Sequence, residues 1–249
     1  MADEPTSINL AARLIFIFKS INRAGDEEIL SNVWARIFEL PPTDIIQIHV
    51  HLAYVKELIR DYERQVKSLP EANQYLFLEP VPTMLTFVTT RFRKIKADRD
   101  ILSRILEKLY LASDRLQQDF PETLIPAADL DDISKQINVL ITSVKASQEI
   151  PNSMRVILFD LLSAIRQSID LYSIRGIRGV RKELFAVAAQ IQEQFSEFEK
   201  AQDTPEVQGF MALFKRIDLV TSGVLKVRTF LQAAAPIVVS LLEQINRTL

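Results

Sequence analysis

The sequence predicts an all-α protein, a multi-helix bundle of about eight to ten helices. Almost every apolar run repeats at steps of three and four residues, the spacing that places side chains on one face of a helix. Only 5 Gly and 11 Pro occur in 249 residues, and most of them stand where helices should begin or end. No run alternates apolar and polar residues as a half-buried strand does.

Residues 1–122 are expected to form an N-terminal helical half. The first helix should stop at Gly25. Its apolar run covers nearly the whole helix circumference, as in a buried helix. After a second, shorter helix, Thr43 caps a third whose apolar stripe is the most regular in the chain, and Pro70 ends it. Residues 71–82 are expected to be irregular or to contain a short turn, and two further helices should follow them.

Residues 120–128 are the expected linker between this half and a C-terminal helical half, residues 123–249. Pro121 and Pro126 lie in that stretch, and both interrupt helical pattern. The alternative is one continuous domain. Within the second half, helical stripes are expected over 130–144 and again from Pro205, which stands at the first position of its helix.

The C-terminal half is built on residues 151–200, which predict a long antiparallel hairpin. Two apolar stripes of helical period lie on either side of a short connector at residues 175–179, in which Gly176 would take a left-handed C-cap conformation. Helices joined by so short a connector should pack face to face. Leu161 and Ile191, in the middle of the two stripes, are predicted core residues.

Composition limits the classes of function. The chain has no cysteine, which excludes disulfides, thiolate metal sites and a cysteine nucleophile. The formal net charge of −2 gives no overall field toward nucleic acid or anionic lipid. The acidic N-terminus has no positively charged leader, which favours the cytoplasm. The longest uncharged run, between Arg228 and Glu243, is shorter than the roughly 20 residues that span a bilayer.

No arrangement of side chains predicts catalysis. His49 and His51, the two histidines, would point about 200° apart on a helix and could not chelate one metal ion. Many of the carboxylates stand in first turns of predicted helices, where they complement the helix dipole. We therefore expect no enzyme, with no catalytic, cofactor-binding or metal-ligating residue and no cofactor.

Two basic groups are candidate binding surfaces. One surrounds the glycines of the predicted connector and could hold an anion or a partner, although the favoured reading is a solvated turn whose cations complement the end of the preceding helix. The other is a basic run that could contact nucleic acid. The members of the first group are Arg175, Arg178, Arg181 and Lys182, and those of the second are Arg91, Arg93, Lys94, Lys96 and Arg99.

The favoured function is a non-enzymatic protein–protein interaction module, of adaptor or inhibitor and immunity-like type, with a protein partner. The apolar segment Phe230–Leu242 supports the alternative, a membrane-acting helical effector, although a core helix or a homo-oligomer interface would explain the segment as well. A helical protein that binds nucleic acid or an anion is the third reading. A nucleic-acid partner is disfavoured by the net charge, and Pro236 and the flanking charges speak against a membrane role.

Overall fold

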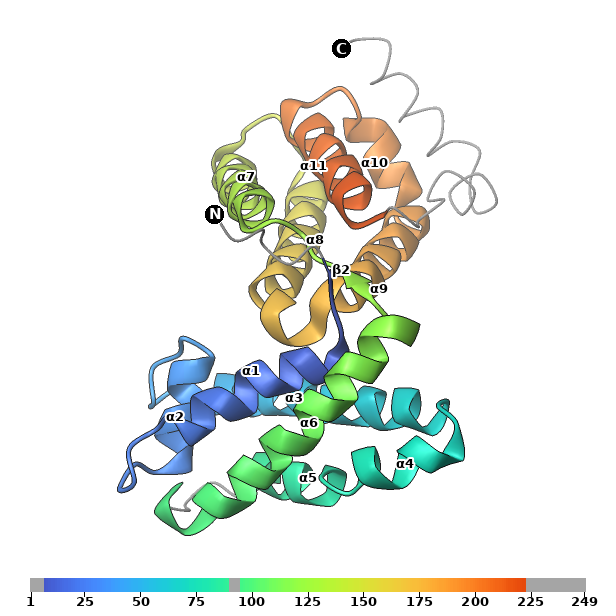
Figure 1. The fold of residues 1–249 in the computed structure, drawn as a ribbon. Helices are drawn as coiled ribbons and strands as arrows, with labels where there is room; N and C mark the ends of the chain where they lie inside the picture. The colour runs from blue at the N-terminus through green and yellow to red at the C-terminus, as the bar shows by residue number, and fades with distance from the viewer. Residues whose placement is uncertain (1–6, 90–94, 223–249) are drawn as a thin grey trace. The chain divides into compact units, whose positions relative to one another are not determined.

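The computed structural model describes residues 7–89 and 95–222, and it is all-α as the sequence predicts (Figure 1). Helices α1 to α11 carry the fold within these ranges. The β structure of this part of the chain is one antiparallel pairing of two-residue strands, β1 (Ser7–Ile8) with β2 (Glu122–Thr123). The prediction of a multi-helix bundle is confirmed.

The chain divides into two compact units. The N-terminal unit runs to Leu124 and also takes in Ser173–Arg175, while the C-terminal unit holds Ile125–Tyr172 and the chain from Gly176 onward. The chain passes from the first unit to the second within the predicted linker, residues 120–128. That the two halves are separate domains stays a prediction.

The N-terminal unit is organised around α1 (Leu10–Asn22), a helix buried on most of its circumference. Leu14 and Phe18 are fully buried, as the predicted buried helix requires. The other helical elements of the unit are α2 (Leu30–Ile37), α3 (Ile45–Lys67), α4 (Glu71–Leu78), α5 (Val81–Thr89), the 3-10 helix η1 (Ile95–Asp98) and α6 (Arg99–Asp119).

Helices α1 and α6 lie side by side in opposite directions. At one end, Asn9 caps α1 by accepting from the Ala12 backbone N–H at 3.0 Å, and its side-chain amide donates to Gln117 Oε1 at 2.8 Å. At the other end, the Arg99 guanidinium donates to the Ala24 carbonyl at 2.6 Å. Polar contacts therefore fix both ends of a pair whose middle is apolar.

Residues 71–82 are more regular than the sequence predicts, because α4 occupies Glu71–Leu78. The prediction failed because this helix has almost no apolar stripe: Tyr75 is 87% exposed. Its position comes instead from a tertiary contact. Tyr62 in α3 is fully buried and its hydroxyl donates to the Phe77 carbonyl at 2.8 Å, and burial raises the pKa of Tyr62 above the usual tyrosine range.

Helix α2 ends in a Schellman motif whose left-handed residue is not a glycine. Glu39 has φ 56°, and its N–H donates to the Arg36 carbonyl at 3.2 Å while the Leu40 N–H donates to the Ala35 carbonyl at 2.8 Å. A side chain with this backbone conformation carries a steric cost that glycine would avoid.

In the described part of the C-terminal unit, five helices pack around one apolar core. Its helices are α7 (Ala127–Ala146), α8 (Asn152–Asp170), α9 (Tyr172–Glu193), α10 (Phe195–Ala201) and α11 (Pro205–Ser222). Helix α8 supplies Met154, Leu158, Leu161 and Ile165 to the core, α9 supplies Leu184, Val187 and Ile191, and α11 supplies Phe210 and Phe214.

The hairpin at 151–200 is present, and its connector runs from Leu171 to Gly176, beginning earlier than predicted but overlapping the predicted residues 175–179. Helix α8 ends at Asp170, Leu171 caps it, and α9 begins at Tyr172 and runs back in the opposite direction (Figure 1). Gly176 lies inside α9, at a kink with φ 62° and ψ −167°. Those angles are essentially restricted to glycine, so the residue does break helical geometry, although it is not a C-cap.

Both predicted stripes contribute to the core. Leu161 is 1% exposed and Ile191 is 4% exposed. No helix in residues 7–89 or 95–222 is long and apolar enough to cross a membrane. The segment Phe230–Leu242, on which the membrane alternative depends, lies outside the described residues.

Candidate functional site

Helices α7 and α11 form an antiparallel pair that is fixed at both ends by polar contacts. Asp132 in α7 makes an ion pair with Arg216 in α11. Near the opposite end, the Ser143 hydroxyl donates to Glu206 Oε1 at 3.3 Å, and Glu206 is largely buried. The spacing of the two helices is therefore set by the protein before anything binds between them.

The two helices approach most closely at Gly209. A Cβ atom at this position would stand 2.7 Å from Cδ2 of Leu140, closer than real Cβ contacts come. Glycine in a helix interior costs roughly 1 kcal/mol relative to alanine. The close approach is the physical reason for a glycine here, since it allows the Leu140 side chain to lie against the α11 backbone.

A groove with a volume of about 430 Å³ runs along the surface between these helices. We call it the α7–α11 groove. Its apolar lining comes from Val139, Leu140, Gly209, Ala212 and Leu213, and its polar rim from Lys135, Gln136 and Arg216.

Apolar side chains of the groove face solvent. Leu213 is buried and forms the floor, but Val139 is 68% exposed and Ala212 is also exposed. Lys135, an exposed lysine, and Arg216 lie toward the end at which Asp132 pairs with Arg216. The arrangement is a preformed apolar groove with charged side chains at one end, which suits the apolar face of a helix better than it suits a polar small molecule.

The sequence analysis did not find this groove. Val139 and Ala212 lie outside the apolar stripes of α7 and α11, and Gly209 stands inside a helical pattern. An isolated glycine in such a pattern can signal close packing. The pairing of α7 with α11 joins segments some 70 residues apart, and nothing in either segment alone predicts it.

The four residues predicted to form the basic tip do not share one environment. Arg175 belongs to the N-terminal unit, where its guanidinium lies 4.6 Å from the ring centre of Tyr54, while the other three belong to the C-terminal unit. Arg178 and Lys182 are exposed. Anion or partner binding by this group stays a prediction.

Arg181 makes a structural contact rather than presenting its charge to solvent alone. Its Nε donates to the Thr221 carbonyl at 2.9 Å, and Nη2 donates to the same oxygen. That carbonyl lies in the last turn of α11, where a cation complements the helix dipole. The neighbouring Asp218 is half-buried, and loss of solvent raises its pKa to about 6, although the Arg181 charge opposes the shift.

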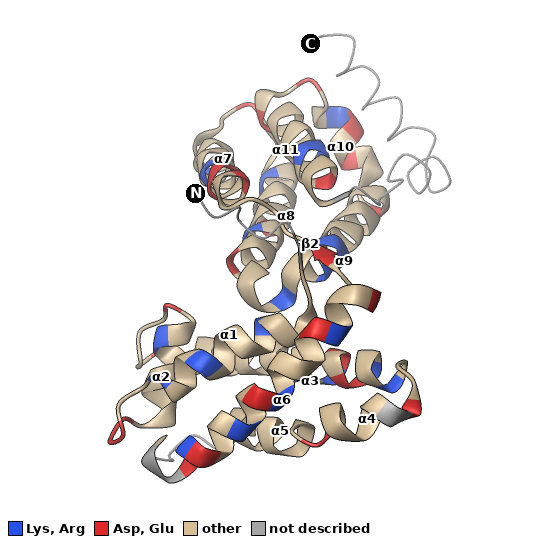
Figure 2. Ribbon diagram, viewed as in Figure 1, with Lys and Arg blue, Asp and Glu red and all other residues tan. Residues whose placement is uncertain are grey.

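The predicted basic surface falls mostly outside what the structure describes. Arg91, Arg93 and Lys94 lie outside the described residues, and the Lys96 side chain is also left undescribed. Arg99 is accounted for structurally, because its Nε pairs with Asp26 Oδ1 at 2.6 Å in addition to its backbone contacts in α1. Figure 2 shows acidic and basic segments interspersed along the helices of each unit. A nucleic-acid surface at this run stays a prediction.

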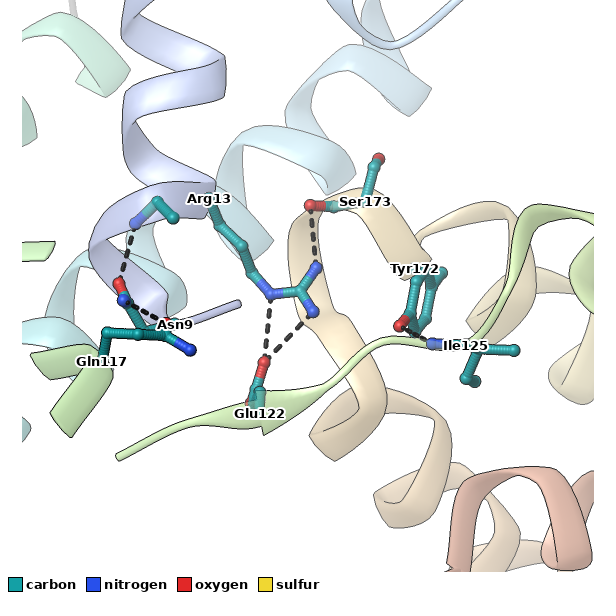
Figure 3. A network of polar contacts seen from close by, with 8 residues as sticks. Asn9, Arg13, Gln117, Glu122, Ile125, Tyr172 and Ser173 are labelled. Carbon is teal, nitrogen blue, oxygen red and sulfur yellow. Dashed lines mark hydrogen bonds and ion pairs between the residues drawn. The ribbon is translucent and has the colours of Figure 1, made fainter. Parts of the chain in front are cut away.

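A buried polar network joins β2 to α1 in the N-terminal unit (Figure 3). Arg13 and Glu122 are 2% and 6% exposed, and both Nε and Nη2 of Arg13 lie 3.1 Å from Glu122 Oε2. Arg13 Nη1 also donates to the Ser173 carbonyl at 3.3 Å. The figure shows the guanidinium between these two acceptors. The network therefore has a structural role, which is to hold β2 against α1.

Both histidines lie in α3. His51 Nδ1 lies 2.8 Å from the Gln47 carbonyl one turn earlier in α3. Across residues 7–89 and 95–222, no group of three or more His, Asp or Glu side chains is placed to hold a metal ion. Comparison of the chain with protein-family models, with curated proteins and with solved structures finds no match.

Proposed function

We propose that this chain is a non-enzymatic interaction module that acts in the cytoplasm and binds an amphipathic helix of a partner protein in the α7–α11 groove. The observation that carries the proposal is the groove itself, with exposed Val139 and Ala212 over a buried floor. A helix laid in such a groove inserts apolar anchors at positions i, i+3 or i+4, and i+7.

One end of the groove carries charged side chains that a partner helix would meet. Lys135 is exposed there, and Arg216 keeps part of its surface exposed while paired with Asp132. Asp129 and Asp131, in the first turns of α7, lie at the same end, so charges of both signs are available to pair with the partner. Charge pairs at such an exposed rim chiefly raise the association rate and fix the orientation, while affinity comes from the apolar anchors.

A photo-crosslinking amino acid placed at Ala212 tests the proposal in the cell that makes the protein. Ala189 in α9 is the matched control position, since it too is an exposed helical alanine of the C-terminal unit. We expect an adduct with one defined protein from position 212 and much less of it from position 189. Equal adducts from both positions, or none from either, would contradict the groove as the binding site.

The two other functional readings can be separated from this one with the intact chain. The membrane reading predicts flotation with anionic liposomes and release of an encapsulated dye, and the nucleic-acid reading predicts a mobility shift that weakens steeply with salt. We expect neither.

A further inference from the structure

We propose that the apolar C-terminal segment of this same chain, Phe230–Leu242, occupies the α7–α11 groove until a partner displaces it. The inference deepens the proposed function and rests on it, because it names an internal competitor for the same groove. Three observations support this occupant: the length of the connection, the apolar character of the segment, and the distribution of charge around the groove.

The connection is long enough. The described part of α11 runs to Ser222, six residues beyond Arg216, and these six residues correspond to about 9 Å along a helix axis. Residues 223–229 separate Ser222 from the apolar segment and could span up to about 23 Å when extended. The chain can therefore turn at the end of α11 and return along the groove toward Gly209.

The segment matches the lining of the groove. No charged residue occurs between Arg228 and Glu243, and Ala233, Ala234 and Ala235 form a stretch of small side chains. Small side chains allow close approach to a shallow groove, as Gly209 does on the other side. Burial of apolar surface contributes about 25 cal/mol for each Å², and an intramolecular segment acts at a high effective concentration.

Charge is complementary along the path. Three carboxylates, Asp129, Asp131 and Asp132, lie in the first turns of α7, at the end of the groove near Arg216. The connecting residues carry Lys226 and Arg228 and no acidic residue. A chain that turns back along the groove brings these two cations past the acidic end of α7, which favours this direction of entry.

A crosslinking experiment on the full-length chain tests the proposal, and the absence of native cysteine makes it clean. Ala212→Cys is combined in turn with Ala233→Cys, Ala234→Cys and Ala235→Cys, and each pair is treated with a short bismaleimide. The control places the first cysteine at Ala189 instead. We expect at least one tail position to form an intramolecular crosslink with position 212 several-fold faster than with position 189.

The other outcomes overturn the proposal. Crosslinks between two chains would make a second copy the occupant, and equal rates from positions 212 and 189 would show that the segment has no preferred site. As a further check, Lys226→Glu with Arg228→Glu should slow the crosslink at low salt. Failure here leaves the proposed function separately testable, because the photo-crosslink at position 212 reports an adduct with a different protein.

Discussion

The two units each contain an ion pair between segments far apart in the sequence, but one pair is buried and the other is exposed. In the N-terminal unit, Arg13 and Glu122 are almost completely removed from solvent and lie at the junction of α1 with β2. In the C-terminal unit, Asp132 and Arg216 are 50% and 33% exposed and lie at the rim of a groove. Both pairs join segments far apart in the sequence, but only the first had to be desolvated for the unit to fold.

The difference indicates which contacts are part of the folded core and which leave a surface available. A buried pair is costly to break, because the remaining charge stays in a poorly solvated place. An exposed pair contributes little, because water and salt already screen it. The C-terminal unit must therefore be stabilised by its apolar core, and its α7–α11 surface can change partners without unfolding the unit.

The largest expected effect is in that apolar core. Leu161→Asp places an unpaired charge at a site that is 1% exposed, and we expect a loss of about 4 kcal/mol or more in the free energy of unfolding. Val139→Asp is the matched control, because the same charge enters a groove residue that is 68% exposed, and its effect should stay within about 0.5 kcal/mol. Urea denaturation of the intact chain measures both. Similar midpoints for the two variants would show that the groove is part of the core.

The second effect concerns the buried pair of the N-terminal unit. Glu122→Gln keeps the shape of the side chain but leaves the Arg13 guanidinium without its counter-charge, and we expect a loss of about 3 kcal/mol. The double replacement Arg13→Met with Glu122→Leu removes both charges and should recover much of that loss. A double variant less stable than Glu122→Gln would mean that the network contributes more to the stability of the unit than the pairing of its two charges.

The fold could be predicted from the sequence where a helix buries one regular face. The stripe of α3 and the core positions Leu161 and Ile191 are of this kind, because the period of the apolar residues is itself the cause of their burial. The local pattern was insufficient for α4, which is held by the Tyr62–Phe77 hydrogen bond, and for α2, whose cap places Glu39 at positive φ. Neither feature follows from residue type.

The candidate site was less predictable than the fold. Gly176 does break helical geometry within the predicted connector, but the end of α8 at Asp170, six residues earlier, has no glycine to mark it. The groove depends on two helices meeting at Leu140 and Gly209, a tertiary contact that neither periodicity nor composition encodes. Basic residues were visible in the sequence, but whether an arginine binds a ligand or caps a helix, as Arg181 does for α11, depends on its neighbours.

A smaller effect is expected at Asp218, the half-buried carboxyl of α11. Its pKa is raised from 3.8 to about 6, so the folded state binds this proton more tightly than the unfolded state. The contribution of Asp218 to stability must therefore fall as pH rises from about 4 to about 6, and stay low above that range. Asp218→Asn should be more stable than the native chain by about 1 kcal/mol at neutral pH, after allowance for solvent screening.

Thermal melting of the native chain and of Asp218→Asn at a series of pH values measures this difference. The two curves should converge near pH 4, where the native carboxyl is protonated in the folded state, and separate as the pH approaches neutrality. A variant that is equally stable at every pH, or one that is less stable at neutral pH, would show that attraction to Arg181 outweighs the loss of solvent around Asp218.

The smallest effect is expected at the exposed pair, and it tests the comparison between the units directly. Asp132→Asn removes the charge that pairs with Arg216 without changing the size of the side chain, and measured exposed pairs contribute roughly 0.2–1 kcal/mol. We expect urea denaturation to give a loss in that range at low salt and almost none at high salt, because salt screens an exposed pair. Glu122→Gln, measured beside it, should keep most of its loss at high salt, since solvent ions do not reach the Arg13 guanidinium. Asp132→Asn could instead prove as costly as Glu122→Gln, or as insensitive to salt. Exposure to solvent would then not be what distinguishes the two ion pairs. The α7–α11 surface would be as fixed a part of the C-terminal unit as the buried network is of the N-terminal unit.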